Sequence, residues 1–183
     1  MMTKKEKLNY IFDYLDSLFP DPKCELNYSK DYELLIAVML SAQTTDKSVN
    51  KVTDILFTKY KTLEELDNAS LEDISNIIKS IGLYKNKAIN LKGIVHKLIL
   101  EYGGIVPLSK EELVKFPGVG IKTAGVVRAE FFKIPEFPVD THVERVSKRL
   151  GLVNPNDSIL EVEEKLKKIT PKERQIKAHH QFI

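Results

Sequence analysis

The chain has very little cysteine and no long apolar run, and each of these absences excludes a class of protein. Its 183 residues contain a single cysteine, Cys24, which excludes an intrachain disulfide framework and fits a reducing compartment. The longest apolar run is much too short to span a bilayer, and no hydrophobic segment follows Met1. We therefore expect a cytoplasmic protein with no membrane contact.

Alternation of apolar and polar residues, the mark of a half-buried strand, is also missing, and helix signals are frequent instead. Ser or Thr stands three residues before an acidic residue, a pattern that caps helix N-termini, at Ser70/Asp73, Ser109/Glu112, Ser158/Glu161 and Thr170/Glu173. Apolar stripes at helical spacing include Val49, Val52, Ile55 and Leu56, and Leu91, Ile94, Val95, Leu98 and Ile99. The sequence predicts an all-α fold whose last helix begins at the Thr170 cap.

Glycine is sparse, yet Gly118 and Gly120 stand on either side of one small residue, Val119, just before a predicted helix over 121–132. Glycine allows a tight turn with exposed backbone N–H groups. Such amides beside a helix N-terminus bind anions, because the first turn lacks partners and the helix dipole is positive there. The segment predicts a helix, a hairpin that holds phosphate, and a second helix. A plain turn between two helices is the alternative.

Lys122 follows the hairpin directly, so its amine can reach a ligand whose phosphate the hairpin holds. A nucleophilic lysine needs a lowered pKa, which a positive helix terminus and partial desolvation can supply. A neighbouring carboxylate would oppose that shift by stabilising the ammonium form. The alternative role for Lys122 is a second contact to phosphate.

Asp140 is a good N-cap for a predicted helix over 141–150. The helix over 121–132 is about 16 Å long, and the link over 133–139 can extend to about 23 Å. The link can therefore return along the helix and bring Asp140 near Lys122. Capping and catalysis are compatible, because a carboxylate held by backbone amides stays ionised and oriented.

These residues, together with two further segments, resemble endonuclease III, a DNA glycosylase and abasic-site lyase of the helix-hairpin-helix superfamily. Residues 34–46 (LLIAVMLSAQTTD) resemble the second-helix signature of that family, and 81–88 (IGLYKNKA) resemble its intercalating loop. The resemblance runs from about Glu25 to the last residue. It implies base-excision DNA repair on double-stranded DNA that contains damaged pyrimidines or abasic sites.

The resemblance also implies a mechanism. An oxidised pyrimidine is rotated out of the duplex, because its sugar C1′ is inaccessible while the base is stacked. Lys122 attacks C1′, expels the base and forms a Schiff base, from which β-elimination cuts the strand, while Asp140 activates the amine or supports the positive charge. Gln43 and Leu83 fill the vacated space. The alternatives are a capping or turn contact for Gln43 and a core contact for Leu83.

Other family positions are implied to contact DNA or to lie near the pocket: Gly118, Val119, Gly120, Thr123 and His142 on DNA, and Asp46 at the pocket. The alternative for Asp46 and His142 is a purely structural role, in which each caps or braces a helix. Total charge gives little guidance, because Lys plus Arg exceeds Asp plus Glu by only 28 − 26 = 2. A DNA-facing rim would come from local clustering of Lys85, Lys87, Arg145, Lys148 and Arg149. Solvated helix faces are the alternative for these residues.

Two helical lobes with a DNA-binding groove between them are the expected architecture. Residues 25–134 would form a continuous helical domain that ends in the helix-hairpin-helix. Residues 1–24 and 135–183 would form the second lobe. The resemblance implies a [4Fe–4S] cluster on four cysteines near the C-terminus, but no cysteine follows Cys24. No cofactor or metal is expected in these residues, and the cluster is expected only with a further cysteine-rich segment. We interpret the second lobe as C-terminally incomplete.

Two other functions remain open beside the glycosylase and lyase. A monofunctional glycosylase would use an activated water, and Lys122 argues against it. A non-catalytic helix-hairpin-helix module would bind DNA without cutting it. In each case we expect a monomer.

Overall fold

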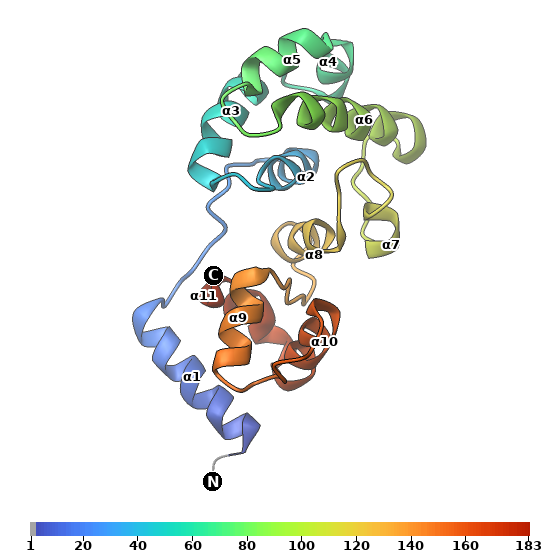
Figure 1. Cartoon of the computed structure of the whole chain (residues 1–183). Coiled ribbons are helices and arrows are strands. Elements are labelled where there is room, and N and C mark those ends of the chain that lie inside the picture. Colours follow the sequence, from blue (N-terminus) through green and yellow to red (C-terminus); the bar gives the residue numbers. More distant parts are fainter. Residues whose placement is uncertain (1–2) are drawn as a thin grey trace. The chain divides into compact units, whose positions relative to one another are not determined.

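A computed structural model describes residues 3–183, and every regular element in them is a helix (Figure 1). The α-helices are α1 Lys4–Leu18, α2 Asp31–Leu40, α3 Asp46–Lys59, α4 Leu63–Asn68, α5 Leu71–Ile78, α6 Tyr84–Tyr102, α7 Lys110–Leu113, α8 Ile121–Glu130, α9 Thr141–Arg149, α10 Ile159–Ile169 and α11 Gln175–Phe182. A short 3₁₀ helix, η1, covers Lys172–Arg174. The all-α expectation is confirmed. None of these helices is long and apolar enough to cross a membrane.

The chain divides into two compact units. One is the continuous segment Glu25–Val127, and the other joins the residues up to Cys24 to Arg128–Ile183. The division falls inside α8, a few residues before the boundary expected after residue 134.

In the continuous unit, α2 is the central helix and packs against α3 and α6. Its segment Leu34–Leu40 is buried throughout, as expected for a helix that is apolar on every side. Ser70 and Ser109 cap α5 and α7 as predicted. The predicted apolar stripe of α6 is buried except at Ile99, which is half-buried, whereas Ile55 of the α3 stripe is exposed and lies outside the core.

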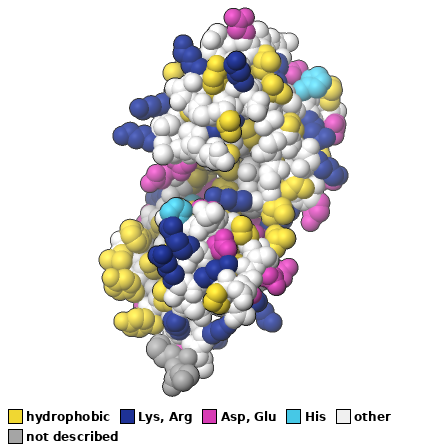
Figure 2. Space-filling model, viewed as in Figure 1, with side chains coloured by type: hydrophobic (Ala, Val, Ile, Leu, Met, Phe, Trp, Pro, Cys, Tyr) yellow, Lys and Arg dark blue, Asp and Glu magenta, His cyan; other side chains and the backbone are white. Residues whose placement is uncertain are grey.

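The second unit is built around an apolar cluster shared by α1, α9, α10 and α11. Phe12 of α1 and Phe182 of α11 join Phe137 in this cluster. The rings of Phe137 and Phe182 pack edge to face, with their centroids 5.8 Å apart. The other face of α1 is different, because Tyr10, Tyr14 and Leu18 recur one turn apart and are exposed. Figure 2 shows apolar side chains gathered along this helix.

The predicted start of the last helix is wrong. Thr170 is the C-cap of α10, and the helical turns that follow are η1 and then α11 from Gln175. Pro171 has ψ 140°, which is extended backbone, so no helix can begin at Thr170. By contrast, Ser158 and Glu161 form a complete capping box on α10, as predicted.

Candidate functional site

The hairpin between α7 and α8 is tight at one glycine. Gly118 has φ 74°, and a Cβ at this position would lie 2.5 Å from Nδ2 of Asn90 and 3.1 Å from Cγ of Met39. Gly118 therefore meets two requirements that only glycine satisfies together. A Cβ at Gly120 would meet no neighbouring heavy atom within 4 Å, and its φ lies outside the left-handed region. Of the two hairpin glycines, only Gly118 is required by the backbone and the packing of the turn.

Helix α6 supports the hairpin from behind. A Cβ on Gly93 of α6 would lie 2.7 Å from Cγ of Pro117, so the two backbones approach closely at this point. Val119 is buried, and its N–H donates to the carbonyl of Phe116 at 3.1 Å. Gly118 and Gly120 stay exposed on either side, at the N-terminal end of α8. This geometry suits an anion at the hairpin.

Lys122 lies exposed in the first turn of α8, next to the half-buried Thr123. Within the same unit its positive charge acts on the carboxyl of Asp46, the first residue of α3. Burial and the nearby Glu25 raise the pKa of Asp46, and the attraction of Lys122 only partly offsets that rise. The sequence did not link these two residues, which stand 76 positions apart (122 − 46 = 76).

Gln43 and Leu83 both have left-handed backbone, with φ 55° and 58°. Gln43 is in the turn between α2 and α3, and Leu83 is the N-cap of α6. Both side chains are exposed, and Leu83 is 63% accessible, so the core contact considered for Leu83 is excluded. Left-handed backbone in residues other than glycine costs roughly 1–3 kcal/mol and is typical of functional sites.

Asp140 and His142 belong to the second unit, at the start of α9. Oδ1 of Asp140 accepts hydrogen bonds from the backbone N–H groups of His142 at 2.9 Å and Val143 at 2.8 Å, so its predicted N-cap role is confirmed. His142 is exposed, and its Nδ1 accepts from the guanidinium of Arg145 at 2.9 Å. Because Lys122 and Asp140 lie in different units, their approach stays a prediction.

The predicted basic rim is wrong at one position. Lys87 is only 5% accessible, and its amine is hydrogen-bonded inside the continuous unit. Lys148 is half-buried and forms an ion pair with Glu144 at 2.7 Å, whereas Lys85, Arg145 and Arg149 are exposed. Figure 2 shows Lys and Arg side chains gathered over α9.

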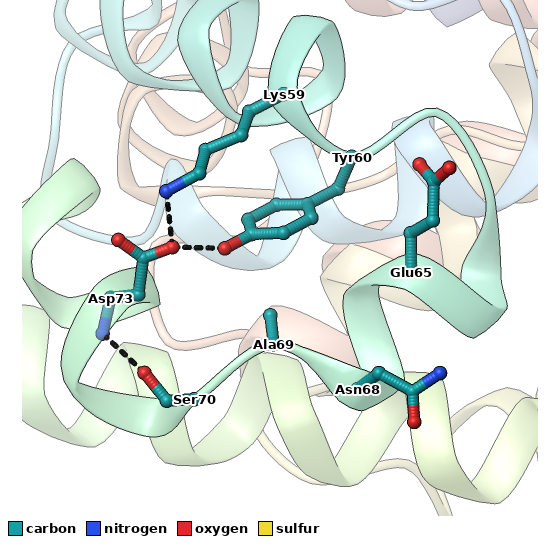
Figure 3. A pocket seen from close by; sticks show the side chains of 7 residues that line it. All are labelled: Lys59, Tyr60, Glu65, Asn68, Ala69, Ser70 and Asp73. Atoms are coloured by element: carbon teal, nitrogen blue, oxygen red, sulfur yellow. Dashed lines mark hydrogen bonds and ion pairs between the residues drawn. The ribbon is translucent and has the colours of Figure 1, made fainter.

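An open depression on α3, α4 and α5 is lined mostly by polar residues, of which the sequence had indicated only Ser70 and Asp73, as a helix-capping pair (Figure 3). There the Asp73 carboxylate accepts from the Lys59 amine and the Tyr60 hydroxyl, and the Lys59 and Tyr60 contacts lower the pKa of Asp73. These three side chains satisfy one another's hydrogen-bonding groups and link α3 to α5. The depression therefore adds no functional residue.

Over residues 3–183, no group of three or more His, Cys, Asp or Glu side chains is placed to hold a metal ion. His180 bonds to Glu130 at 2.6 Å, and His179 is buried against Phe137. A [4Fe–4S] cluster needs four thiolates, and Cys24 is the single cysteine, so these residues do not fit that cluster.

Comparisons with known proteins agree with this geometry. Residues 36–172 match the family described as HhH-GPD superfamily base excision DNA repair protein. Endonuclease III of Bacillus subtilis (strain 168) is 48% identical over 182 residues, which are 100% of this chain and 83% of that protein. Endonuclease III of Escherichia coli (strain K12) is 41% identical over 100% of this chain and 85% of its own length.

A solved structure of a trapped endonuclease III–DNA covalent intermediate superposes with a TM-score of 0.93 at 51% identity. It covers 100% of this chain, which spans 85% of that protein. A non-covalent endonuclease III–DNA complex gives the same TM-score at 50% identity. The chain belongs to the endonuclease III family of HhH-GPD base-excision DNA repair proteins.

Proposed function

We propose that this chain removes oxidised pyrimidines from double-stranded DNA and cuts the resulting abasic site through a Schiff base on Lys122. Its family makes it a base-excision repair enzyme, a DNA glycosylase and abasic-site lyase. The observation that carries the residue assignment is the position of Lys122, exposed in the first turn of α8 immediately after the hairpin.

In the proposed reaction, neutral Nζ of Lys122 attacks C1′ of the extruded nucleotide. The bond from C1′ to the base breaks, and the base leaves with the bonding electrons. The nitrogen then loses a proton, the C1′–O4′ bond breaks with its electrons on O4′, which takes up a proton, and the C1′=N bond of the Schiff base forms. Removal of a C2′ proton then expels the 3′ phosphate, which is the β-elimination that cuts the strand.

Two carboxylates assist Lys122 in this proposal. Asp140 activates the amine or supports the positive charge on the sugar, and its two amide hydrogen bonds hold the carboxylate in one orientation. We also assign Asp46 to the pocket that receives the base, and the effect of the Lys122 charge on the pKa of Asp46 supports this assignment. Gln43 and Leu83 enter the space that the base leaves, a role that suits their exposure and left-handed backbone.

The hairpin and the start of α9 hold the DNA backbone in this proposal. The proposed contacts are Gly118, Val119, Gly120, Thr123 and His142. The enzyme acts as a monomer on nucleoid DNA in the cytoplasm.

Two labelled duplexes test the function, one with an oxidised pyrimidine and one with an abasic site. Cleavage of both without added alkali is expected. If the base is lost but the strand is cut only after alkali, the enzyme is a monofunctional glycosylase. If the duplex is bound and neither reaction occurs, the chain is a DNA-binding module without catalysis, and the proposal fails.

A further inference from the structure

Lys87 of α6 is a buried lysine that holds the turn carrying Gln43. Its Nζ donates to the carbonyl of Ala42 at 2.8 Å and to Oγ1 of Thr44 at 2.8 Å. Ala42 and Thr44 are the two neighbours of Gln43 in the chain. The ammonium group is therefore hydrogen-bonded to this left-handed turn on both sides of Gln43.

The same residue is tied to Leu83. The backbone N–H of Lys87 donates to the carbonyl of Leu83 at 3.0 Å, which is the bond that closes the first turn of α6. The side chain of Lys87 thus fixes one strained turn, while its backbone fixes the residue in the other. Both turns lie in the unit Glu25–Val127, so one residue links them directly.

Burying a lysine has a cost that an apolar side chain would avoid. Burial lowers the pKa of Lys87, which shows that the charged form is disfavoured at this position. Its hydrogen-bond acceptors, a carbonyl and a hydroxyl, are both neutral. A buried amine at this position is explained if its hydrogen bonds are needed to orient the 42–44 turn for function.

We propose that Lys87 is a positioning residue that holds Gln43 and Leu83 at a fixed spacing, so that both enter the stack when a nucleotide is extruded. This inference rests on the wedge role given to these two residues under the proposed function. Without the Lys87 amine, the turn at Gln43 relaxes independently of α6. Extrusion from a duplex then becomes less favourable, while the chemistry at Lys122 is unaffected.

Lys92 provides a matched control on the same helix. Its amine also donates to backbone carbonyls near the end of α4, those of Leu66 at 3.3 Å, Asp67, and Ala69 at 3.0 Å, and lies 3.9 Å from the Asp67 carboxylate. Lys92→Met therefore removes a comparable lysine-to-carbonyl contact that does not involve either wedge turn. Lys87→Met is the test variant, and Lys87→Arg keeps the charge and the donors.

Single-turnover rates are measured on a duplex with an oxidised pyrimidine and on single-stranded DNA with an abasic site, which has no stacked partner to displace. Lys87→Met should lower the duplex rate about tenfold, because small misplacements of positioning groups have effects of that size or larger, and should leave the single-strand rate unchanged. Lys87→Arg should recover part of the duplex rate. Equal losses on both substrates, or the same change of ratio in Lys92→Met, would show a purely structural role and overturn the inference.

A second measurement separates this inference from the proposed chemistry. In a Lys122→Ala background, 2-aminopurine opposite an abasic site reports unstacking when the protein binds the duplex. The fluorescence rise on binding should be largely lost when Lys87→Met is added and retained when Lys92→Met is added. If the rise is unchanged by Lys87→Met, the inference is wrong even where Lys122 proves to be the nucleophile. If the unaltered chain shows no lyase activity but the rise depends on Lys87, the proposed function fails and the inference stands.

Discussion

Gly118 and Lys87 show what a sequence reveals about a single residue. The motif around Gly118 predicted a tight turn, because few residues other than glycine adopt its φ of 74°. Lys87 was expected on the surface, either in a DNA-facing rim or on a solvated helix face, and lysine is mostly exposed in proteins. Its burial depends on contacts with a turn more than 40 positions earlier in the chain, at Ala42 and Thr44. The electrostatic effect of Lys122 on Asp46 likewise has no local signal.

The two hairpin glycines should respond differently to the same substitution. Gly118→Ala should lower the free energy of unfolding by about 1–3 kcal/mol, because alanine is strained at this φ and its Cβ meets Asn90 and Met39. Gly120→Ala should change it by less than about 0.5 kcal/mol, because its Cβ enters open space. Urea unfolding measures both. Equal losses would contradict the assignment of the tight turn to Gly118.

At the scale of elements, most helix starts were readable because a capping side chain acts on its own first turn. Ser70, Ser109 and Ser158 behave in this way. Thr170 does not, because the extended backbone of Pro171 delays the helix. The tie between α1 and the segment formed by η1 and α11 was not predicted. In it the Asp16 carboxylate accepts from Arg174 at 2.7 Å and from Gln181 at 2.8 Å, and pairs with Lys177 at 2.7 Å.

This tie predicts how stability depends on pH. Hydrogen bonds from Arg174, Lys177 and Gln181 hold the pKa of Asp16 well below its usual range. A carboxyl whose pKa is lower in the folded state contributes stability above its unfolded pKa of about 3.9 and loses it as the pH falls toward the folded value. Asp16→Asn should therefore lower the melting temperature at pH 7, and the melting temperature of this variant should fall less than that of the unaltered chain below pH 4. If the melting temperatures of the two proteins change in parallel between pH 7 and the acidic range, the assignment is contradicted.

At the scale of the whole molecule, the family could be inferred from ordered motifs, but the make-up of the second unit has no local signal. Its α1 must pack with α11 at the other end of the chain, around Phe12 and Phe182. Such contacts depend on the completed fold, because no nearby residue specifies them. Charge is also a property of the whole molecule. With a net charge of only +2, attraction to DNA must come from local groups.

A few exposed basic residues should therefore account for the salt dependence of the affinity for DNA. Arg149 is exposed near the end of α9, whereas Lys148 is already paired with Glu144 at 2.7 Å. Arg149→Ala should reduce the slope of log K against log salt concentration by about 0.9, the value for one phosphate contact, and Lys148→Ala should reduce it less. Fluorescence anisotropy at several salt concentrations gives both slopes. A larger effect for Lys148→Ala would exclude this view of α9.

The central claim is that Lys122 is the nucleophile, and borohydride trapping on a duplex with one abasic site tests it most directly. The matched control is Lys115→Ala, which removes an exposed lysine that precedes the hairpin and pairs with Glu112 at 2.6 Å. We expect a covalent protein–DNA adduct with the unaltered chain and with Lys115→Ala, and none with Lys122→Ala, although that variant still binds the duplex. An adduct that persists in Lys122→Ala, or no adduct from the unaltered chain despite binding, would contradict the claim.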